Sequence, residues 1–204
     1  MQINIVLEHT VYDPEKMPRI QTPQIALAGR SNVGKSSLIN SLGRGRLAKV
    51  SSHPGKTRSV NFYHLPNMDL YLVDLPGYGY AARSKREREI WPLLVERCLQ
   101  RNPHLTRAVV LLDSRIPPQN LDLQLMDYLS QKGLDILPIL TKTDKTKMGQ
   151  RNKIQKSWQR LLGLSEPPLL YSAKTGTGQE DLWKMLQQTQ PEHAGNEAST
   201  DQDG

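Results

Sequence analysis

Short apolar segments alternate along the chain with longer amphipathic ones between about residue 24 and residue 188. In residues 147–162, apolar side chains recur at i, i+4, i+7 and i+8 from Ile154, which predicts a helix with one side on the core. The predicted strands are Gln24–Ala28, Val60–Leu65, Asp69–Val73, Ala108–Leu112, Ile136–Thr141 and Leu169–Tyr171. The predicted helices are Lys35–Leu42, Lys85–Gln100, Asn120–Gln131, Lys147–Leu162 and Gln179–Gln188.

Strands that are separated by helices indicate a three-layer α/β fold, in which helices cover both faces of a mostly parallel, six-stranded sheet. The consecutive strands on either side of residues 66–68 should form a hairpin, which makes one strand of the sheet antiparallel. In such sheets, ligands bind at the carboxyl ends of the strands. We therefore expect the functional residues directly after strands.

The ends of the chain differ from this central domain, which spans residues 23–188. Residues 1–22 are predicted to form an N-terminal arm with one short strand, Ile3–Leu7. Residues 189–204 are polar, contain Pro and Gly, and include four acids but no Lys or Arg. This composition predicts a disordered acidic tail.

The formal net charge is +7 in spite of that tail. A basic body favours nucleic acid or an anionic membrane face, or serves general solubility. The single cysteine, Cys98, excludes an internal disulfide and fits a cytoplasmic protein. The apolar segments are too short to span a bilayer, and the first residues do not resemble a signal peptide, so we expect no membrane insertion.

The first predicted strand of the domain leads into GRSNVGKS, Gly29–Ser36, which fits the phosphate-loop pattern G-x-x-x-x-G-K-[ST] at every fixed position. Glycines allow backbone N–H groups to surround a phosphate, and the following helix adds the positive end of its dipole. Lys35 can bind the outer phosphates, and the Ser36 hydroxyl can bind Mg²⁺. The pattern predicts a P-loop NTPase fold with a nucleotide site.

TKTD, Thr141–Asp144, follows a later strand. A carboxylate there can accept hydrogen bonds from N1–H and the exocyclic amine of guanine, a donor pair that adenine lacks. The aliphatic part of Lys142 can lie over the base. After the next strand, Ser172–Lys174 includes the small Ala173, whose backbone N–H can reach guanine O6.

Asp74 ends another strand and begins DLPG, a D-x-x-G pattern. At that place a carboxylate can hold a Mg²⁺-bound water, while the amide of Gly77 reaches a γ-phosphate. The basic segment Gly43–Ser59 is predicted to be either a mobile loop or a flexible linker. Within it we expect Thr57 to bind the metal, ahead of Ser51, Ser52 and Ser59.

Together these motifs resemble small GTPases of the translation-factor-related class, and most closely the EngB/YihA-type ribosome-biogenesis GTPases. The stretches GRSNVGKSSLIN, PGKTRSVNFY, DLPGYGYA and LTKTDK match that family, and the similarity covers about residues 22–188. The resemblance implies a GTP-binding protein that hydrolyses GTP slowly and acts as a switch in assembly of the large ribosomal subunit. It also implies a link to the cell cycle through normal cell division and septation.

The resemblance also assigns roles to residues. Lys35, Thr57 and Gly77 are expected to be catalytic, and the magnesium ligands are Ser36 and Thr57, with Asp74 through water. The expected nucleotide-binding residues are Gly29, Arg30, Ser31, Asn32, Val33, Gly34, Lys35, Ser36, Ser37, Gly55, Lys56, Thr57, Arg58, Ser59, Asp74, Leu75, Pro76, Gly77, Thr141, Lys142, Thr143, Asp144, Ser172, Ala173 and Lys174.

Three positions qualify this picture. Thr141 stands where GTPases usually carry Asn, whose amide reaches guanine N7. Tyr78 stands where Ras-like enzymes carry the Gln that orients the attacking water, so intrinsic hydrolysis should be slow. Tyr78 and Tyr80 serve either packing or partner recognition. Asn32 either binds K⁺ beside the phosphates or is a structural surface residue.

Basic residues gather in three clusters, which we expect to hold ribosomal RNA in one nucleotide state. The clusters are Arg44, Arg46, Lys49, Lys56 and Arg58; Arg83, Lys85, Arg86 and Arg88; and Lys147, Arg151, Lys153, Lys156 and Arg160. The second cluster is interleaved with acids and also fits a solvated helix face. The expected partners are ribosomal particles, both rRNA and ribosomal proteins, and the protein is expected to be a monomer.

Two other functions compete with this one. An ATP-using P-loop enzyme would need lid and acceptor residues that the sequence does not indicate. A division-site or membrane-associated protein with GTP as a structural ligand would need an amphipathic or lipidated anchor. Asp113 and Arg115, after the fourth strand, either brace the core or touch a partner.

Overall fold

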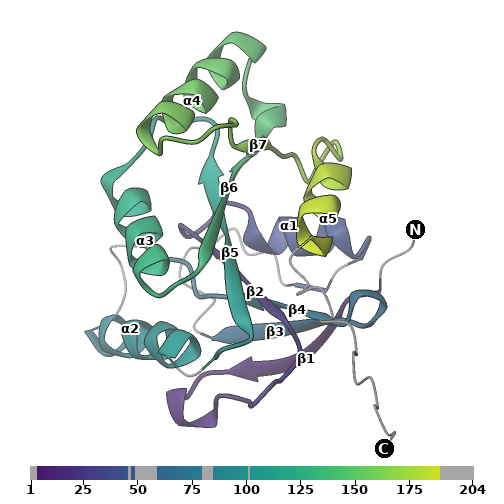
Figure 1. Cartoon of the computed structure of the whole chain (residues 1–204), viewed down its shortest axis with the longest axis vertical. Helices are drawn as coiled ribbons and strands as arrows, with labels where there is room; N and C mark the ends of the chain where they lie inside the picture. Colours follow the sequence, from purple (N-terminus) through teal and green to yellow (C-terminus); the bar gives the residue numbers. More distant parts are fainter. Residues whose placement is uncertain (1–3, 46, 49–58, 80–84, 101, 189–204) are drawn as a thin grey trace, which may run out of the picture.

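A computed structural model describes residues 4–45, 47–48, 59–79, 85–100 and 102–188, with the backbone alone for residues 85–91. These residues form a three-layer α/β fold (Figure 1). Among them, no helix has the length and apolar character needed to cross a membrane. The tail, residues 189–204, lies outside the described residues, and its disorder stays a prediction.

The middle layer is a seven-stranded sheet in the order β1-β3-β4-β2-β5-β6-β7. Its strands are β1 (Val6–Val11), β2 (Gln24–Gly29), β3 (Val60–Leu65), β4 (Leu70–Asp74), β5 (Leu105–Asp113), β6 (Asp135–Thr141) and β7 (Leu169–Leu170). Within the sheet, β3 runs antiparallel to both of its neighbours, and the other adjacent pairs are parallel. The hairpin from β3 to β4 turns through the 3₁₀ helix η2 (Pro66–Met68), which confirms the predicted hairpin.

The sheet has one strand more than the six that the sequence predicts, because the N-terminal segment adds β1 at one edge. β1 begins at Val6 rather than Ile3, and its register with β3 shifts between Leu7 and His9. Five of its six residues are exposed, so no apolar alternation marks the strand in the sequence. Val11 at its end is buried, and this anchors the strand in the core.

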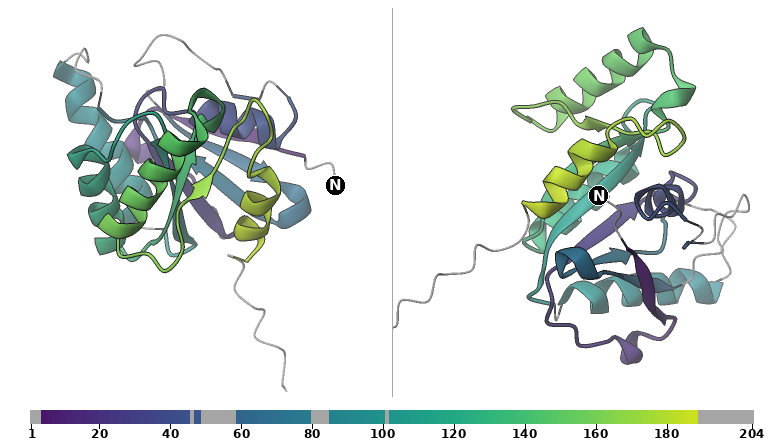
Figure 2. Two further views of the ribbon diagram at one scale, coloured as in Figure 1. Left: turned by 90° about the horizontal axis from the view of Figure 1, so that it is seen from above. Right: turned by 90° about the vertical axis from the view of Figure 1, so that its right-hand side faces the viewer.

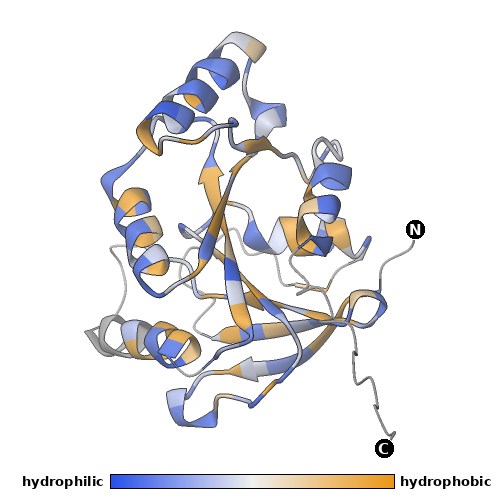
Figure 3. Cartoon of the chain, in the orientation of Figure 1, coloured by the Kyte–Doolittle hydropathy of each residue, from blue (hydrophilic) through white to orange (hydrophobic). Residues whose placement is uncertain are grey.

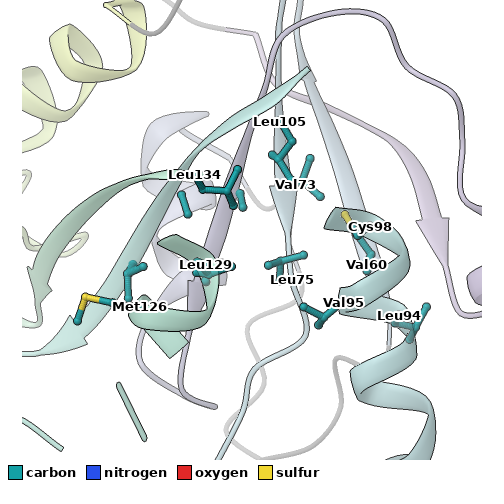
Figure 4. Close-up of a cluster of buried hydrophobic side chains, with 14 of the residues drawn as sticks. Val60, Val73, Leu75, Leu94, Val95, Cys98, Leu105, Met126, Leu129 and Leu134 are labelled. Carbon is teal, nitrogen blue, oxygen red and sulfur yellow. The ribbon is translucent and has the colours of Figure 1, made fainter. Parts of the chain in front are cut away.

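In the described residues, five α-helices cover the sheet: α1 (Lys35–Leu42), α2 (Lys85–Gln100), α3 (Asn120–Gln131), α4 (Met148–Leu161) and α5 (Gln179–Gln187). Helices α1 and α5 lie on one face, and α2, α3 and α4 lie on the other (Figures 1 and 2). Ile39 and Leu182 belong to the apolar cluster on the first face. Leu94, Leu129 and Trp158 belong to the cluster on the second face, part of which Figure 4 shows.

The parallel strands determine where the polar loops meet. Because β2, β4, β5, β6 and β7 point the same way, the segments that follow them lie at one edge of the sheet. Strands β2 and β4 are buried along their whole length, as expected for the centre of a sheet covered on both faces. This buried centre holds the loops that follow it at one edge of the sheet.

Candidate functional site

The phosphate-loop motif connects β2 to α1. Gly34 precedes the helix with φ of 123°, a conformation that residues with a Cβ rarely adopt. Helix α1 has no acidic residue in its first turn and no capping side chain among the described residues, so its first N–H groups can bind an anion. Lys35 begins this helix and is 8% exposed, and Ser36, half-buried, follows it.

Asp74 lies at the end of β4, beside Leu27 of β2, and is 2% exposed. Burial raises the pKa of its carboxyl, while the charge of Lys35 and a hydrogen bond with Asn61 act in the opposite direction. Its Oδ1 has no hydrogen-bond partner among the described residues. A buried carboxylate oxygen of this kind can hold a ligand such as metal-bound water.

The loop after Asp74 packs directly on the phosphate loop. The backbone N–H of Ser31 donates to the carbonyl of Tyr78 at 2.9 Å, and Arg30 and Tyr78 form a parallel bridge. A Cβ on Gly77 would lie 3.0 Å from both Cα and N of Ser31. A side chain at this position would push the two backbones apart by a few tenths of an ångström, so glycine favours the close approach of the two loops.

The side chain of Tyr78 turns toward α3. Its hydroxyl donates a hydrogen bond to Oδ1 of Asp122, which is 4% exposed. Burial raises the pKa of Tyr78, and the contact with Asp122 raises it further. This contact packs the half-buried Tyr78 against α3, which is one of the two roles predicted for it, and Tyr80 lies outside the described residues.

A cavity of about 530 Å³ opens between α1 and the loops that follow β6 and β7. It is lined by Gly34, Ser37, Asn40, Ser41, Thr141, Lys142, Asp144, Lys145, Tyr171, Ala173 and Lys174. The Ser172 hydroxyl donates to Oδ1 of Asp144 at 2.7 Å, which fixes the carboxylate at the cavity. The 3₁₀ helix η3 (Thr143–Lys145) carries this aspartate. The cavity thus unites both predicted base-recognition segments with the start of α1.

Thr141 and Thr143 are buried and contact protein carbonyls. Thr141 Oγ1 lies 2.8 Å from the carbonyl of Val33 and 3.0 Å from that of Leu112, and its single proton can serve one of them at a time. Thr143 Oγ1 donates to the carbonyl of Tyr171 at 3.1 Å. The Thr141 hydroxyl therefore connects the phosphate loop to the sheet, and it has no second proton to donate to a base.

Asp113 braces the same region. Its Oδ2 accepts hydrogen bonds from Lys142 at 2.9 Å and from Arg115 at 2.7 Å. Burial acts to raise the pKa of Asp113, but these hydrogen bonds outweigh it and bring the pKa down to about 2. Lys142 also donates to the carbonyl of Asn32 at 2.6 Å, so this lysine joins the base motif to the phosphate loop.

Several predicted site residues lie outside the described part of the chain. These are Gly55, Lys56, Thr57 and Arg58, together with the basic residues Arg46, Lys49 and Arg83. Ser59 is described and buried, and its hydroxyl donates to Asn61, the residue that hydrogen-bonds Asp74. The predicted nucleotide-binding set omits four residues that line the cavity, Asn40, Ser41, Lys145 and Tyr171. Asn40 and Lys145 end the stretches GRSNVGKSSLIN and LTKTDK but were given no role there, whereas no motif includes Ser41 and Tyr171.

Comparison with known proteins agrees with this geometry. The family model described as 50S ribosome-binding GTPase matches residues 24–142. Two relatives named "Probable GTP-binding protein EngB" come from Oleidesulfovibrio alaskensis and Maridesulfovibrio salexigens. The first is 52% identical over 91% of this chain and 85% of its own, and the second is 48% identical over 98% of this chain and 100% of its own.

Solved structures show the same fold. The crystal structure of a probable GTP-binding protein EngB has a TM-score of 0.67 at 22% identity and covers 81% of this chain and 97% of its own. Aquifex aeolicus Era bound to GDP and AlF₄⁻ has a TM-score of 0.68 at 21% identity and covers 85% of this chain and 58% of its own. The predicted P-loop fold is confirmed.

Proposed function

Since this chain belongs to the EngB group of the 50S ribosome-binding GTPase family, we propose that it is a nucleotide-dependent switch in assembly of the large ribosomal subunit. Members of this family are P-loop GTPases, so the protein binds GTP and GDP and hydrolyses GTP. The observation that carries the proposal is the contact of the Asp74–Gly79 loop with the phosphate loop, since Gly77 packs against Ser31. A loop held there can adopt one position with a γ-phosphate and another without it.

We assign the two ends of the nucleotide to the two ends of this site. The phosphates would lie along residues 29–36, facing the first amides of α1 and Lys35. The guanine would enter the 530 Å³ cavity, where Asp144, held by Ser172, accepts from its N1–H and amino group. Lys142 would flank the base, and the amide of Ala173 would face guanine O6.

GTPases of this kind generally use Mg²⁺, and the residues present fit that ion. The described residues contain no group of three or more His, Cys, Asp or Glu that could hold a metal alone. This suits Mg²⁺, which shares its ligands among one or two protein oxygens, water and substrate phosphates. Ser36 and Thr57 would be direct ligands and Asp74 would act through water, and the ion would neutralise charge on the phosphates.

Intrinsic hydrolysis should be slow, because the phenol of Tyr78 donates to Asp122 and offers no amide to orient a water. Asn32 is a candidate for holding K⁺ beside the phosphates. It has φ of 62°, which Asn tolerates better than most residues, so a structural role explains its presence equally well. Comparison of hydrolysis in KCl and NaCl separates the two roles, because equal rates would exclude K⁺ activation.

Two findings on related proteins support ribosomal RNA as the partner. The family description names 50S binding, and Era has been solved with MgGDPNP and a segment of 16S ribosomal RNA, at a TM-score of 0.63 and 20% identity to this chain. By family resemblance we extend the proposal to a cytoplasmic location, a monomer, and a link to cell division and septation.

The test is sedimentation of the purified protein with isolated large and small subunits, with a non-hydrolysable GTP analogue, GDP or an ATP analogue. We expect co-sedimentation with the large subunit with the GTP analogue and much less with GDP or the ATP analogue. Equal binding in all three states, or to both subunits, would contradict a switch acting on the large subunit. Nucleotide-independent binding to anionic vesicles would instead support the membrane-associated alternative.

A further inference from the structure

Helix α4 carries cations without acids. Its 14 residues, MGQRNKIQKSWQRL, include four basic residues and no acidic one. Lys145 and Lys147 come just before it, and between residues 142 and 165 the single acid is Asp144. Figure 3 colours much of α4 as hydrophilic. This is the one of the three predicted basic clusters whose side chains the structure describes in full.

The outer cations form one stripe. At about 100° per residue, Lys153, Lys156 and Arg160 fall within an arc of about 60°, opposite the buried Ile154 and Trp158. All three cations are exposed, and they span about 10 Å of the helix. We call these three residues the α4 stripe. It projects away from the core, where a large polyanion can reach it.

Apart from Arg160, which lies in the last turn where the helix dipole favours a cation, the charge pattern does not stabilise the helix. Lys145 and Lys147 lie near the N-terminus of α4, where the helix dipole disfavours cations. Lys156 and Arg160 are like charges at i and i+4, which repel each other. None of the ion pairs among the described residues involves α4. Local rules are broken in this way where function requires it.

The surroundings of the stripe fit RNA better than a membrane. A helix that lies on a membrane places large apolar residues next to its cations. The exposed apolar residues of α4, Met148 and Leu161, lie at the two ends of the helix and about 110° from the middle of the stripe. Its exposed neighbours are instead the short polar residues Asn152 and Ser157. The Asn152 amide can donate to phosphate oxygens, whereas the Ser157 hydroxyl donates to the carbonyl of Lys153 at 2.9 Å and can accept from a ribose hydroxyl.

The start of the helix that carries the stripe lies at the nucleotide site. Lys145 belongs to η3 and lines the cavity beside Asp144. One turn into α4, Arg151 Nη1 donates to the carbonyl of Thr143 at 3.5 Å. The helix therefore begins at the edge of the base pocket, and the stripe lies about 8 to 18 Å further along its axis. A polyanion that follows α4 would reach from the stripe to the nucleotide site.

We propose that the α4 stripe binds the phosphate backbone of ribosomal RNA beside the guanine pocket. This inference adds a binding surface to the proposed function. It rests on that function only for the choice of large-subunit RNA as the ligand. The stripe then contributes a sequence-independent, salt-dependent part of the affinity.

The test uses the full chain and protein-free large-subunit ribosomal RNA, with the affinity measured over a series of salt concentrations. The variant is Lys153→Gln, Lys156→Gln and Arg160→Gln together. The matched control is Lys16→Gln, Arg19→Gln and Lys184→Gln, which removes three exposed cations elsewhere. For three lost phosphate contacts, the slope of log affinity against log salt should become shallower by about 2 to 3, and the affinity near 0.15 M salt should fall on the order of 100-fold.

The control should behave as wild type. The melting temperature of the stripe variant should change little, since the repulsion that is removed offsets the loss of Arg160 from the last turn, and its GDP affinity should be unchanged. The inference is wrong if the stripe variant and the control bind RNA alike, or if the wild type binds no ribosomal RNA. If the stripe inference fails, the expected nucleotide-dependent sedimentation with the large subunit still holds. If sedimentation instead does not depend on the nucleotide, the proposed switch function fails, but RNA binding by the stripe still holds.

Discussion

At the scale of single residues, the two aspartates of the site have opposite surroundings. Asp74 is buried with one oxygen unpartnered among the described residues, whereas Asp144 is exposed and held by the Ser172 hydroxyl. The first suits a ligand that enters with the phosphates, and the second suits donors on the edge of a base. We therefore expect different effects from substituting each aspartate.

Asp144→Asn should exchange guanine for xanthine. An amide can accept from N1–H and donate to the 2-oxo group of xanthine, but it faces the 2-amino group of guanine with one acceptor fewer. We expect GDP affinity to fall about 100-fold or more and XDP affinity to rise, measured by calorimetry. Asp181→Asn, an exposed acid on α5, is the control and should leave both affinities unchanged. Unaltered GDP binding by Asp144→Asn would refute the assignment.

Asp74→Asn should raise the stability of the nucleotide-free protein in a pH-dependent way. Because burial raises the pKa of Asp74, the wild type bears no penalty below the usual aspartate pKa of about 3.9 and loses stability as pH rises through the raised value. The variant should therefore melt higher than wild type near pH 7 but not below about pH 4. It should also lose GTP hydrolysis. A melting-temperature difference that does not change with pH would contradict this account.

Gly77→Ala should uncouple the loop from the phosphates. Its methyl group would lie 3.0 Å from the Ser31 backbone, so the two loops must separate by a few tenths of an ångström. We expect hydrolysis to fall about 100-fold, as when one positioned hydrogen-bond donor to a transition state is lost, while GDP affinity changes little. In Gly149→Ala, the added methyl group meets nothing within 4 Å, and that variant should keep wild-type activity. Wild-type hydrolysis by Gly77→Ala would count against γ-phosphate sensing.

At the scale of elements, the hydrogen bond from Tyr78 to Asp122 joins the glycine loop to α3. Tyr78→Phe removes the donor and leaves the buried carboxylate of Asp122 without this hydrogen bond. The free energy of unfolding should therefore fall by about 1–3 kcal/mol. Tyr12→Phe, at a 64% exposed position, should change it by less than about 0.5 kcal/mol. Denaturant unfolding measures both. Adding Asp122→Leu to Tyr78→Phe should restore part of the loss, and a further drop would show that the two side chains act independently.

The sequence predicts the ends of a helix or strand well where a glycine or a motif marks the boundary. Helix α1 begins directly after Gly34, as predicted. Strand β5 begins three residues earlier than predicted, since Arg107 lies in the strand through its contact with Asp135 on β6 at 2.6 Å. That polar residue interrupts the apolar run, and its partner is 28 residues away. Strand β1 was mispositioned for a similar reason, as its pairing with β3 is not local.

For the site, the motif residues can be predicted because each motif is continuous in the chain. The hydrogen bonds that hold these residues in place cannot be predicted, since they join positions that are far apart in the sequence. Thr141 contacts Val33 across 108 residues, and Tyr78 contacts Asp122 across 44. Such pairs depend on the order of strands in the sheet, which no local pattern contains.

At the scale of the whole molecule, one sheet brings two separate recognition systems together. The phosphate loop follows β2, and the base loops follow β6 and β7, which are two and three positions further along the sheet. Thr141 and Lys142 connect these loops through the carbonyls of Val33 and Asn32. A bound nucleotide would span both, so binding should stabilise the fold by about 2.7 kcal/mol at a hundredfold excess over its Kd.

Together, the cavity selects guanine while the phosphate loop holds the phosphates. Titration calorimetry of the full chain with GDP and with ADP, both with Mg²⁺, tests it most directly. The account predicts tight binding of GDP and binding of ADP weaker by about 1,000-fold or more, because adenine lacks the donor pair that Asp144 accepts. Equal affinity for the two nucleotides would contradict it.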